Sequence, residues 1–115
     1  MILTDIEAKL KEIDDNVYYG MVHRSRAETV WNYIVFNRTG VKYSANKTAA
    51  SDSFDVHIIR ENYIPEGLED DVVTKLTELP GVRVSGDSSF HYTEKPNTDT
   101  VVEMLTISFV RARKS

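Results

Sequence analysis

The chain has 115 residues, 41% of them hydrophobic and 28% charged, which is the size and composition of one folded domain over residues 1–115. It has no cysteine, which excludes disulfides and thiolate metal sites. Its formal net charge of −4 argues against general nucleic-acid binding, which depends on an excess of Lys and Arg. The N-terminal sequence MILTDIEAKLKEID lacks the pattern of a signal peptide, and no stretch reaches the roughly 18 apolar residues of a membrane span.

The N-terminal segment predicts a helix. Thr4 and Glu7 have the spacing of a capping box, in which each side chain bonds the backbone amide of the other residue. Apolar residues then recur at helical spacing from Ile6 to Ile13, and Asp14-Asp15-Asn16 ends the pattern. A helix this short must pack against other elements to persist.

Two strands are predicted next, over Val17–Val22 and Trp31–Arg38. The second is unusual because both of its faces are apolar in the middle, with Tyr33 and Val35 on one side and Ile34 and Phe36 on the other. A helix layer covers only one face. The other face needs either a neighbouring subunit or further cover from the same chain, such as a second layer or a folded-back hairpin.

The segment Ser44–Ser53, SANKTAASDS, is small and polar and predicts an exposed loop. A loop this long in a compact domain is often functional. The following segment, Phe54–Tyr63, returns to the composition of a strand.

The second half predicts a helix followed by strands. Leu68, Val72, Leu76 and Leu79 repeat at helical spacing, and Pro80-Gly81 stops the helix. A short strand over Val82–Ser85 follows, and then a hairpin of Phe90–Thr93 and Val101–Arg113 around KPNTD. The order is a helix, three strands, a second helix and then two or three strands (α-β-β-β-α-β-β). It predicts an α+β fold, in which an antiparallel or mixed sheet carries two packed helices.

No local motif indicates catalysis or metal binding. The three histidines, His23, His57 and His91, are far apart in sequence and lack Cys or carboxylates at ligand spacing. No glycine-rich phosphate loop and no nucleophile elbow is present. We therefore expect a binding or structural protein, with no enzyme activity, metal or cofactor.

The order of these elements resembles the small tail-completion, or tail-terminator, proteins of long-tailed bacteriophages and prophages. The resemblance extends over nearly the whole chain. It rests on the N-terminal helix, the Tyr- and Trp-rich middle, the segment 44–53 and the strand FDVHIIREN. It continues through the helix LEDDVVTKLTELPGVRV and the closing strand VVEMLTISFVRAR with Glu103 and Arg111.

The resemblance implies a structural subunit of the virion, located at the head–tail junction and in the bacterial cytoplasm before assembly. Such proteins form rings, commonly six-fold, that cap the tail tube and join it to the head connector. The implied partners are copies of the same chain, the tail tube protein and the connector protein, with no nucleic-acid specificity and no membrane. Candidate interface residues lie in the two-faced strand, the polar segment and the basic C-terminus: Trp31, Tyr33, Asn46, Lys47, Arg111 and Arg113.

Two other functions remain open. A small ligand-binding or regulatory α+β domain, in monomeric or dimeric form, requires an apolar pocket, for which Trp31, Tyr33, Phe54 and Phe90 are candidates. An enzyme with a dispersed site would use His57, His91 or Glu103.

Overall fold

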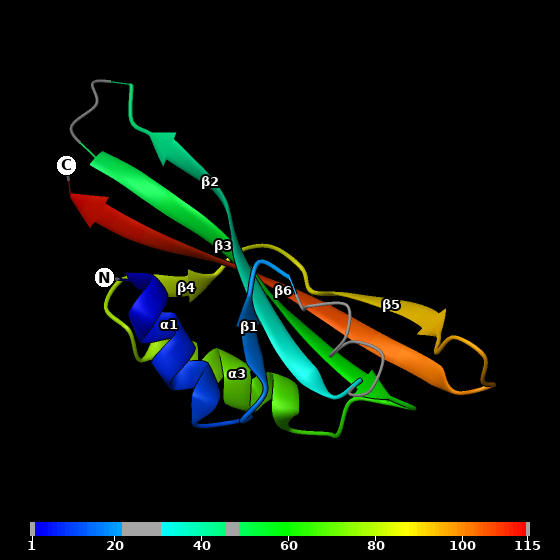
Figure 1. Cartoon of the computed structure of the whole chain (residues 1–115). Coiled ribbons are helices and arrows are strands. Elements are labelled where there is room, and N and C mark those ends of the chain that lie inside the picture. Colours follow the sequence, from blue (N-terminus) through cyan, green and yellow to red (C-terminus); the bar gives the residue numbers. More distant parts are fainter. Residues whose placement is uncertain (1, 22–30, 46–48, 115) are drawn as a thin grey trace.

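The computed structural model describes residues 2–21, 31–45 and 49–114 (Figure 1). Within these residues the fold is α+β, with two helices packed on a six-stranded mixed sheet. The helices are α1, Ile2–Lys11, and α3, Leu68–Thr77. The strands are β1 Val17–Tyr19, β2 Tyr33–Tyr43, β3 Ala49–Glu61, β4 Val82–Val84, β5 Ser89–Glu94 and β6 Val101–Lys114.

Two long strands, β3 and β6, lie side by side within the sheet. β3 and β6 pair antiparallel over their whole lengths, from Ala49 opposite Lys114 to Glu61 opposite Val102. The strand order is β1-β2-β3-β6-β4, and β5 also pairs with β6. β1 pairs parallel with the start of β2. Because β2, β3 and β6 are long, the molecule is elongated, with extents of 53 × 24 × 23 Å.

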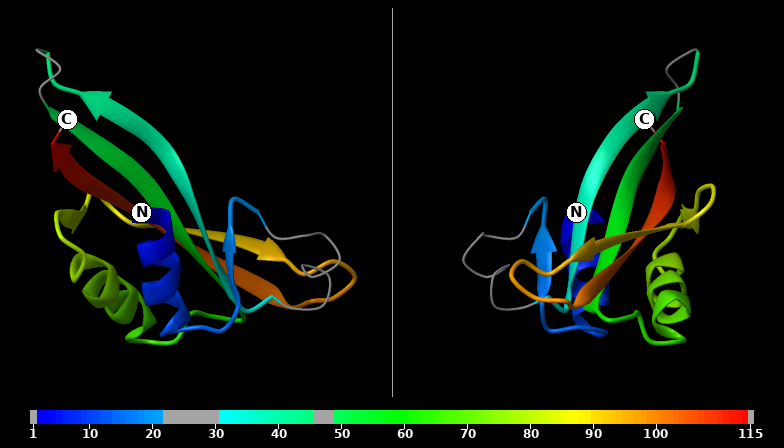
Figure 2. Two further views of the ribbon diagram at one scale, coloured as in Figure 1. Left: turned by 60° about the vertical axis from the view of Figure 1, so that its left-hand side comes forward. Right: turned by 90° about the vertical axis from the view of Figure 1, so that its right-hand side faces the viewer.

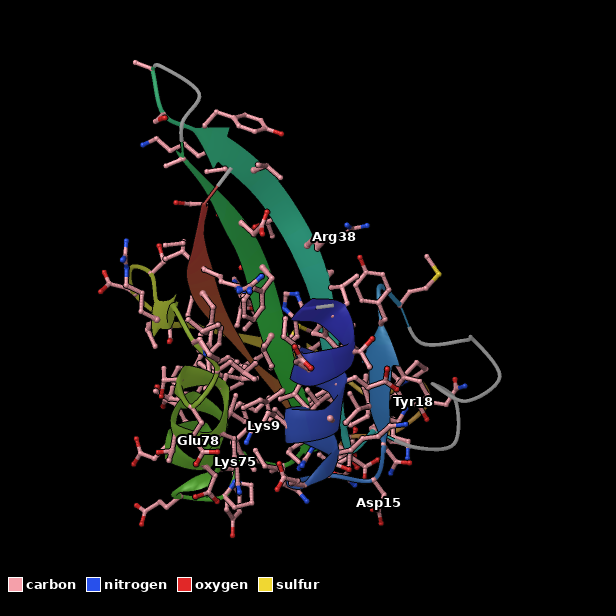
Figure 3. All side chains as sticks on the ribbon, turned by 90° about the vertical axis from the view of Figure 1, so that its left-hand side faces the viewer. Lys9, Asp15, Tyr18, Arg38, Lys75 and Glu78 are labelled. Atoms are coloured by element: carbon pink, nitrogen blue, oxygen red, sulfur yellow. The ribbon has the colours of Figure 1, made fainter. Side chains whose placement is uncertain are left out.

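Both helices cover the same face of the sheet, as Figure 2 shows. Ile6 and Leu10 of α1 and Val72 and Leu76 of α3 are fully buried there. They pack on alternate residues of the central strands, including a pair of phenylalanines, Phe54 and Phe109, whose rings stack 5.2 Å apart. At the surface, Lys9 of α1 contacts Glu78 after α3 at 2.8 Å (Figure 3), and solvent screens this exposed ion pair.

Most predicted elements are present, with changed boundaries. The predicted hairpin at the C-terminus and the one-sided alternation of β6 are confirmed, since Leu105, Ile107 and Phe109 are fully buried. The predicted capping box is wrong, because α1 begins at Ile2 and Thr4 therefore lies inside the helix. The helix begins earlier because Leu3 already packs against the core.

The predicted loop Ser44–Ser53 is also wrong over its second half. β3 begins at Ala49, so only residues 44–48 separate it from β2, and residues 46–48 lie outside the described part. Residues 49–53 pair with β6 on one side, and from Ala50 onwards also with β2 on the other. These residues are strand because their backbone groups hydrogen-bond to both neighbouring strands. The weak strand propensity of Ala and Ser does not predict this pairing.

A β-bulge divides β2. Arg38 is opposite Phe54, but Gly40 is opposite Ser53, so Thr39 has no partner across the ladder. An extra residue reverses which side chains point to which face and bends the strand. Beyond the bulge Val41 and Tyr43 are therefore on the helix side of the sheet, together with Phe54.

Candidate functional site

Beyond the bulge, three strands extend past the helices and form an arm. We define the arm as residues 38–45 and 49–53 of the β2–β3 hairpin together with residues 110–114 of β6 (Figures 1 and 2). Every residue of β2 from Arg38 to Tyr43 is exposed, including the apolar side chain of Val41 and, at 61%, that of Tyr43. The arm is therefore held by backbone pairing more than by a core of its own.

The arm is strongly basic. The residues of the arm include five basic ones and one acidic residue, Asp52. Arg38 is exposed and its Nε donates to the hydroxyl of Tyr19 at 3.0 Å. The Lys42 side chain is exposed and makes no ion pair with any described residue. Arg111 is opposite Asp52 in the ladder. The arm thus presents a net positive charge.

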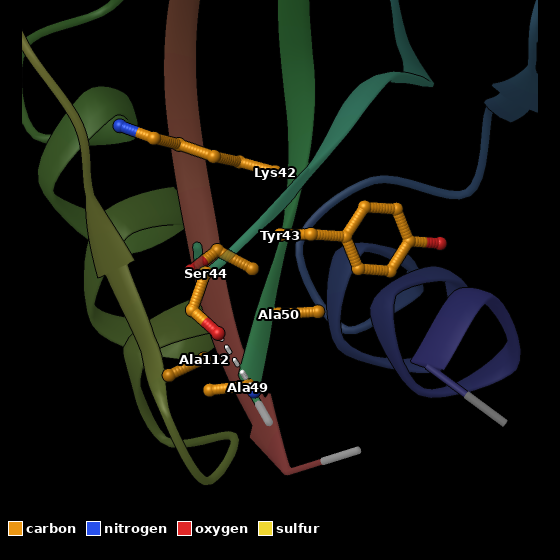
Figure 4. Close-up of a pocket in the computed structure, with 7 residues that line it drawn as sticks. Lys42, Tyr43, Ser44, Ala49, Ala50 and Ala112 are labelled. Atoms are coloured by element: carbon orange, nitrogen blue, oxygen red, sulfur yellow. Dashed lines mark hydrogen bonds between the residues drawn. The ribbon is translucent and has the colours of Figure 1, made fainter. Parts of the chain in front are cut away.

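A shallow hollow of about 510 Å³ lies near the tip of the arm (Figure 4). Small residues, among them Ala49, Ala50 and Ala112, line it, and the Ala49 amide donates to Ser44 Oγ at 3.1 Å. Lys42 and Tyr43 extend in opposite directions from the strand. Polar side chains do not converge on the hollow in the way that a small-molecule site requires.

The opposite end of the molecule carries a groove of about 560 Å³, which we call the acidic groove. It lies between the start of α3 and the β5–β6 hairpin. Its lining contains four uncharged residues, four carboxylates and two exposed aromatic residues. The carboxylates and aromatic residues are Glu66, Glu69, Asp70, Glu103, Phe90 and Tyr92.

Only one of these carboxylates is engaged within the described chain. Glu103 accepts a hydrogen bond from the Ile64 amide at 2.8 Å, and its hydrogen bond with Tyr92 raises the pKa of that phenol. Glu66, Glu69 and Asp70 form no ion pair with any described residue. The groove therefore presents uncompensated negative charge beside exposed aromatic rings.

Charge is thus separated along the two longest strands. Residues 61–71 and 89–103 contain eight acidic residues and one basic residue, Lys95, which pairs with Glu61 at 2.6 Å. Glu103 lies near the start of β6 and Arg111 near its end, so a single strand connects the two ends. The net charge of −4 conceals this separation.

The face of the sheet away from the helices has its own apolar cluster, which we call the opposite-face cluster. Tyr33, Val35, Ile59 and Val102 are buried there, and Tyr18 packs edge-on against Tyr33 with ring centroids 6.0 Å apart. Trp31 packs against this cluster, and its buried indole N–H finds no acceptor among the described residues. Both faces of the two-faced strand are consequently covered within one chain, without a neighbouring subunit.

A row of polar side chains adjoins this cluster. His57 Nε2 lies 2.8 Å from Asn37 Oδ1, and Nδ1 lies 2.9 Å from Thr106 Oγ1. Burial lowers the pKa of His57, and the nearby Asp55 opposes this shift. A neutral imidazole satisfies both contacts if Nε2–H donates to Asn37 and Nδ1 accepts from Thr106. The row joins β2, β3 and β6, which is a structural role.

The four predicted interface residues that the structure describes do not form one surface. Arg111 and Arg113 lie on the arm, whereas Trp31 and Tyr33 belong to the opposite-face cluster, and Tyr33 is only 8% exposed. Asn46, Lys47 and His23 lie outside the described residues. Sequence reasoning missed Lys42 and the acidic groove, although a charge count by segment indicates both.

The predicted aromatic pocket is not formed. Trp31 and Tyr33 are on one face of the sheet, Phe54 is in the core on the other, and Phe90 lines the acidic groove. His57 and His91 occupy different strands, β3 and β5. Within the described residues no three His, Asp or Glu side chains gather at metal-binding distance.

Comparison with known proteins assigns no family. No protein-family model matches the chain, and a search of curated protein sequences finds no match either. Of the helices in the described part, none has the length and apolar character needed to cross a membrane.

Proposed function

We propose that the chain is a structural subunit that assembles into a ring, caps the tail tube of a bacteriophage or prophage, and joins the tube to the head connector. The basis is the resemblance of the element order to tail-completion proteins, from the N-terminal helix to the closing strand. The observation that supports it best is the exposed basic arm, which extends the sheet well beyond its helix-covered core.

The arm has little value for a domain that acts alone. Fixing each extended residue costs about 1–2 kcal/mol of backbone entropy, and the exposed side chains of β2 beyond the bulge bury little to offset that. A surface that another subunit or the tail tube covers gives such an extension a function. Repeated weak contacts around a ring then add to a stable assembly.

The first test is the native mass, measured by light scattering over a wide concentration range and followed by electron microscopy. We expect a closed ring of about six subunits, as closed head-to-tail contacts allow. The control replaces residues 43–50 with Asn-Gly, a pair that favours a two-residue hairpin turn. This shortens the arm at the Lys42–Ser51 pair and leaves the helix-covered core intact. A compact two-fold dimer whose mass does not depend on the arm would contradict the proposal.

The second test is genetic. Deleting the gene from the phage or prophage that encodes it should yield filled heads and separate tails that do not join. Complementation by the intact chain should restore complete particles, and the arm-shortened chain should not. Normal particles from the deletion strain would refute the proposed function.

The alternative function, a small ligand-binding domain, has one observation in its favour. A groove of about 390 Å³ lies between α1 and the base of the arm, and its lining includes Leu3, Ile6 and Val41 together with Arg38. This volume lies within the range of small-ligand sites. A metabolite that co-purifies with the native chain would favour this function over the ring. The Ile6→Ala variant should then lose the metabolite while its native mass stays unchanged.

A further inference from the structure

We infer that the arm of one copy docks into the acidic groove of the next copy, in a head-to-tail contact. The inference rests on the proposed function for closure of the contacts into a ring, whereas the contact itself follows from the chain. The occupant of the groove is a second copy because the complementary surface is present at the other end of the same molecule.

Charge is the first argument. The arm carries five basic residues to one acidic, and the segments around the groove carry eight acidic to one basic. Lys42 on the arm and Glu66, Glu69 and Asp70 in the groove form no ion pairs within the described chain. Complementary potentials of this kind steer encounters and select partner and orientation.

Apolar contact is the second argument. The arm exposes Val41 and Tyr43, and the groove exposes Phe90 and Tyr92 beside its carboxylates. On the arm, Arg38 is on the same face as Val41 and Tyr43, whereas Lys42 is on the other face. Each end therefore combines apolar surface with charge of one sign, as in an interface with an apolar centre and a polar rim. Two arms would repel each other and so would two grooves, so arm-to-groove contact is favoured.

Geometry is the third argument. The arm and the groove lie at opposite ends of β3 and β6, in a molecule 53 Å long. A contact between two different surfaces on one chain is heterologous, and repetition of that contact produces a ring when the rotation closes. A two-fold dimer formed through two arms, or through two grooves, would instead bring like charges together, which opposes it.

The absence of cysteine makes the contact directly testable by disulfide trapping. Equal amounts of Tyr43→Cys, on the arm, and Tyr92→Cys, in the groove, are mixed under mild oxidation at low salt. We expect a mixed disulfide in several-fold excess over the control mixture of Tyr43→Cys with Thr74→Cys, a substitution at an exposed position on α3. Since screening lengths shorten with salt, the excess should fall in about 0.5 M NaCl.

Charge reversal supplies a second readout that does not depend on folding of any single variant. Adding Glu66→Lys and Asp70→Lys to the groove copy should abolish the excess, and adding Arg38→Glu and Lys42→Glu to the arm copy should restore it. Trapping of Tyr43→Cys with Tyr92→Cys at the level of the control, or indifference to both reversals, would overturn the inference.

The outcomes also separate this contact from the proposed function. A closed ring with trapping at the control level would retain the ring and reject the arm-to-groove contact. Efficient, charge-dependent trapping could also occur in open filaments, or the gene deletion could leave phage particles normal. Either result would retain the contact and reject the tail-terminator function.

Discussion

The same three strands, β2, β3 and β6, behave differently in the two halves of the molecule. In the helix-covered half, alternate residues such as Phe36, Val56 and Ile107 are almost completely buried. In the arm, β2 is exposed at every residue, although its ladder with β3 continues to Tyr43 opposite Ala50. Backbone pairing can therefore extend a sheet well beyond the core that stabilises it.

The largest expected contrast comes from aromatic truncation on the helix side of the β2–β3 hairpin. Phe54 is 2% exposed and stacks on Phe109, so Phe54→Ala should lower the free energy of unfolding by about 3–5 kcal/mol. Urea denaturation followed by circular dichroism measures this loss. A loss below about 1 kcal/mol would place Phe54 with the arm and not with the core.

The opposite-face cluster should behave as a core. Tyr33 is 8% exposed, so Tyr33→Asp should destabilise the chain by about 3 kcal/mol by placing a charge among apolar side chains. Denaturation and native mass are measured on the same samples. A fully stable monomer that has lost assembly would show that Tyr33 acts in an interface after all.

A smaller effect should appear as a pH dependence. Burial holds the pKa of His57 below its usual value of 6.5, so the unfolded chain takes up this proton at a higher pH than the folded chain does. As the pH falls from about 7.5 through the unfolded value towards the folded one, His57 should therefore reduce stability.

His57→Gln isolates this contribution, because glutamine keeps hydrogen-bonding groups in the polar row. The variant should lose less stability than the unmodified chain when both are compared by urea denaturation at about pH 7.5 and pH 5. Equal losses in the two proteins would show that the contacts to Asn37 and Thr106 tolerate the charged imidazolium.

The smallest expected effect is in the arm. Tyr43 is on the same side of the hairpin as Phe54 but is 61% exposed, so Tyr43→Ala should change the free energy of unfolding by at most about 0.5 kcal/mol. The same substitution should weaken self-association, measured by light scattering. Destabilisation comparable to that of Phe54→Ala would mean that the arm contributes to the core, and would remove the contrast between the two halves.

Local sequence patterns were enough to predict the α+β class, the helix that starts at Leu68, the C-terminal hairpin and the one-sided alternation of β6 from Met104 to Phe109. These features depend on local periodicity and on turn residues, which can be read without knowledge of distant contacts. The separation of charge is also present in the sequence, but only the strand register shows that the basic and acidic segments lie at opposite ends.

The arm, the bulge and the cover of the two-faced strand depend on contacts between segments that are distant in sequence. Residues 49–53 are strand because β6 provides their hydrogen-bond partners across some 60 residues of chain, a contact that composition does not encode. Thr39 is an extra residue that shifts the β2–β3 register by one, so Val41 and Tyr43 lie on the helix side of the sheet. The periodicity of the sequence does not predict this shift. Tyr33 and Val35 are buried because they pack with residues as distant in sequence as Val102. Local periodicity does not show whether such non-local contacts cover an apolar face.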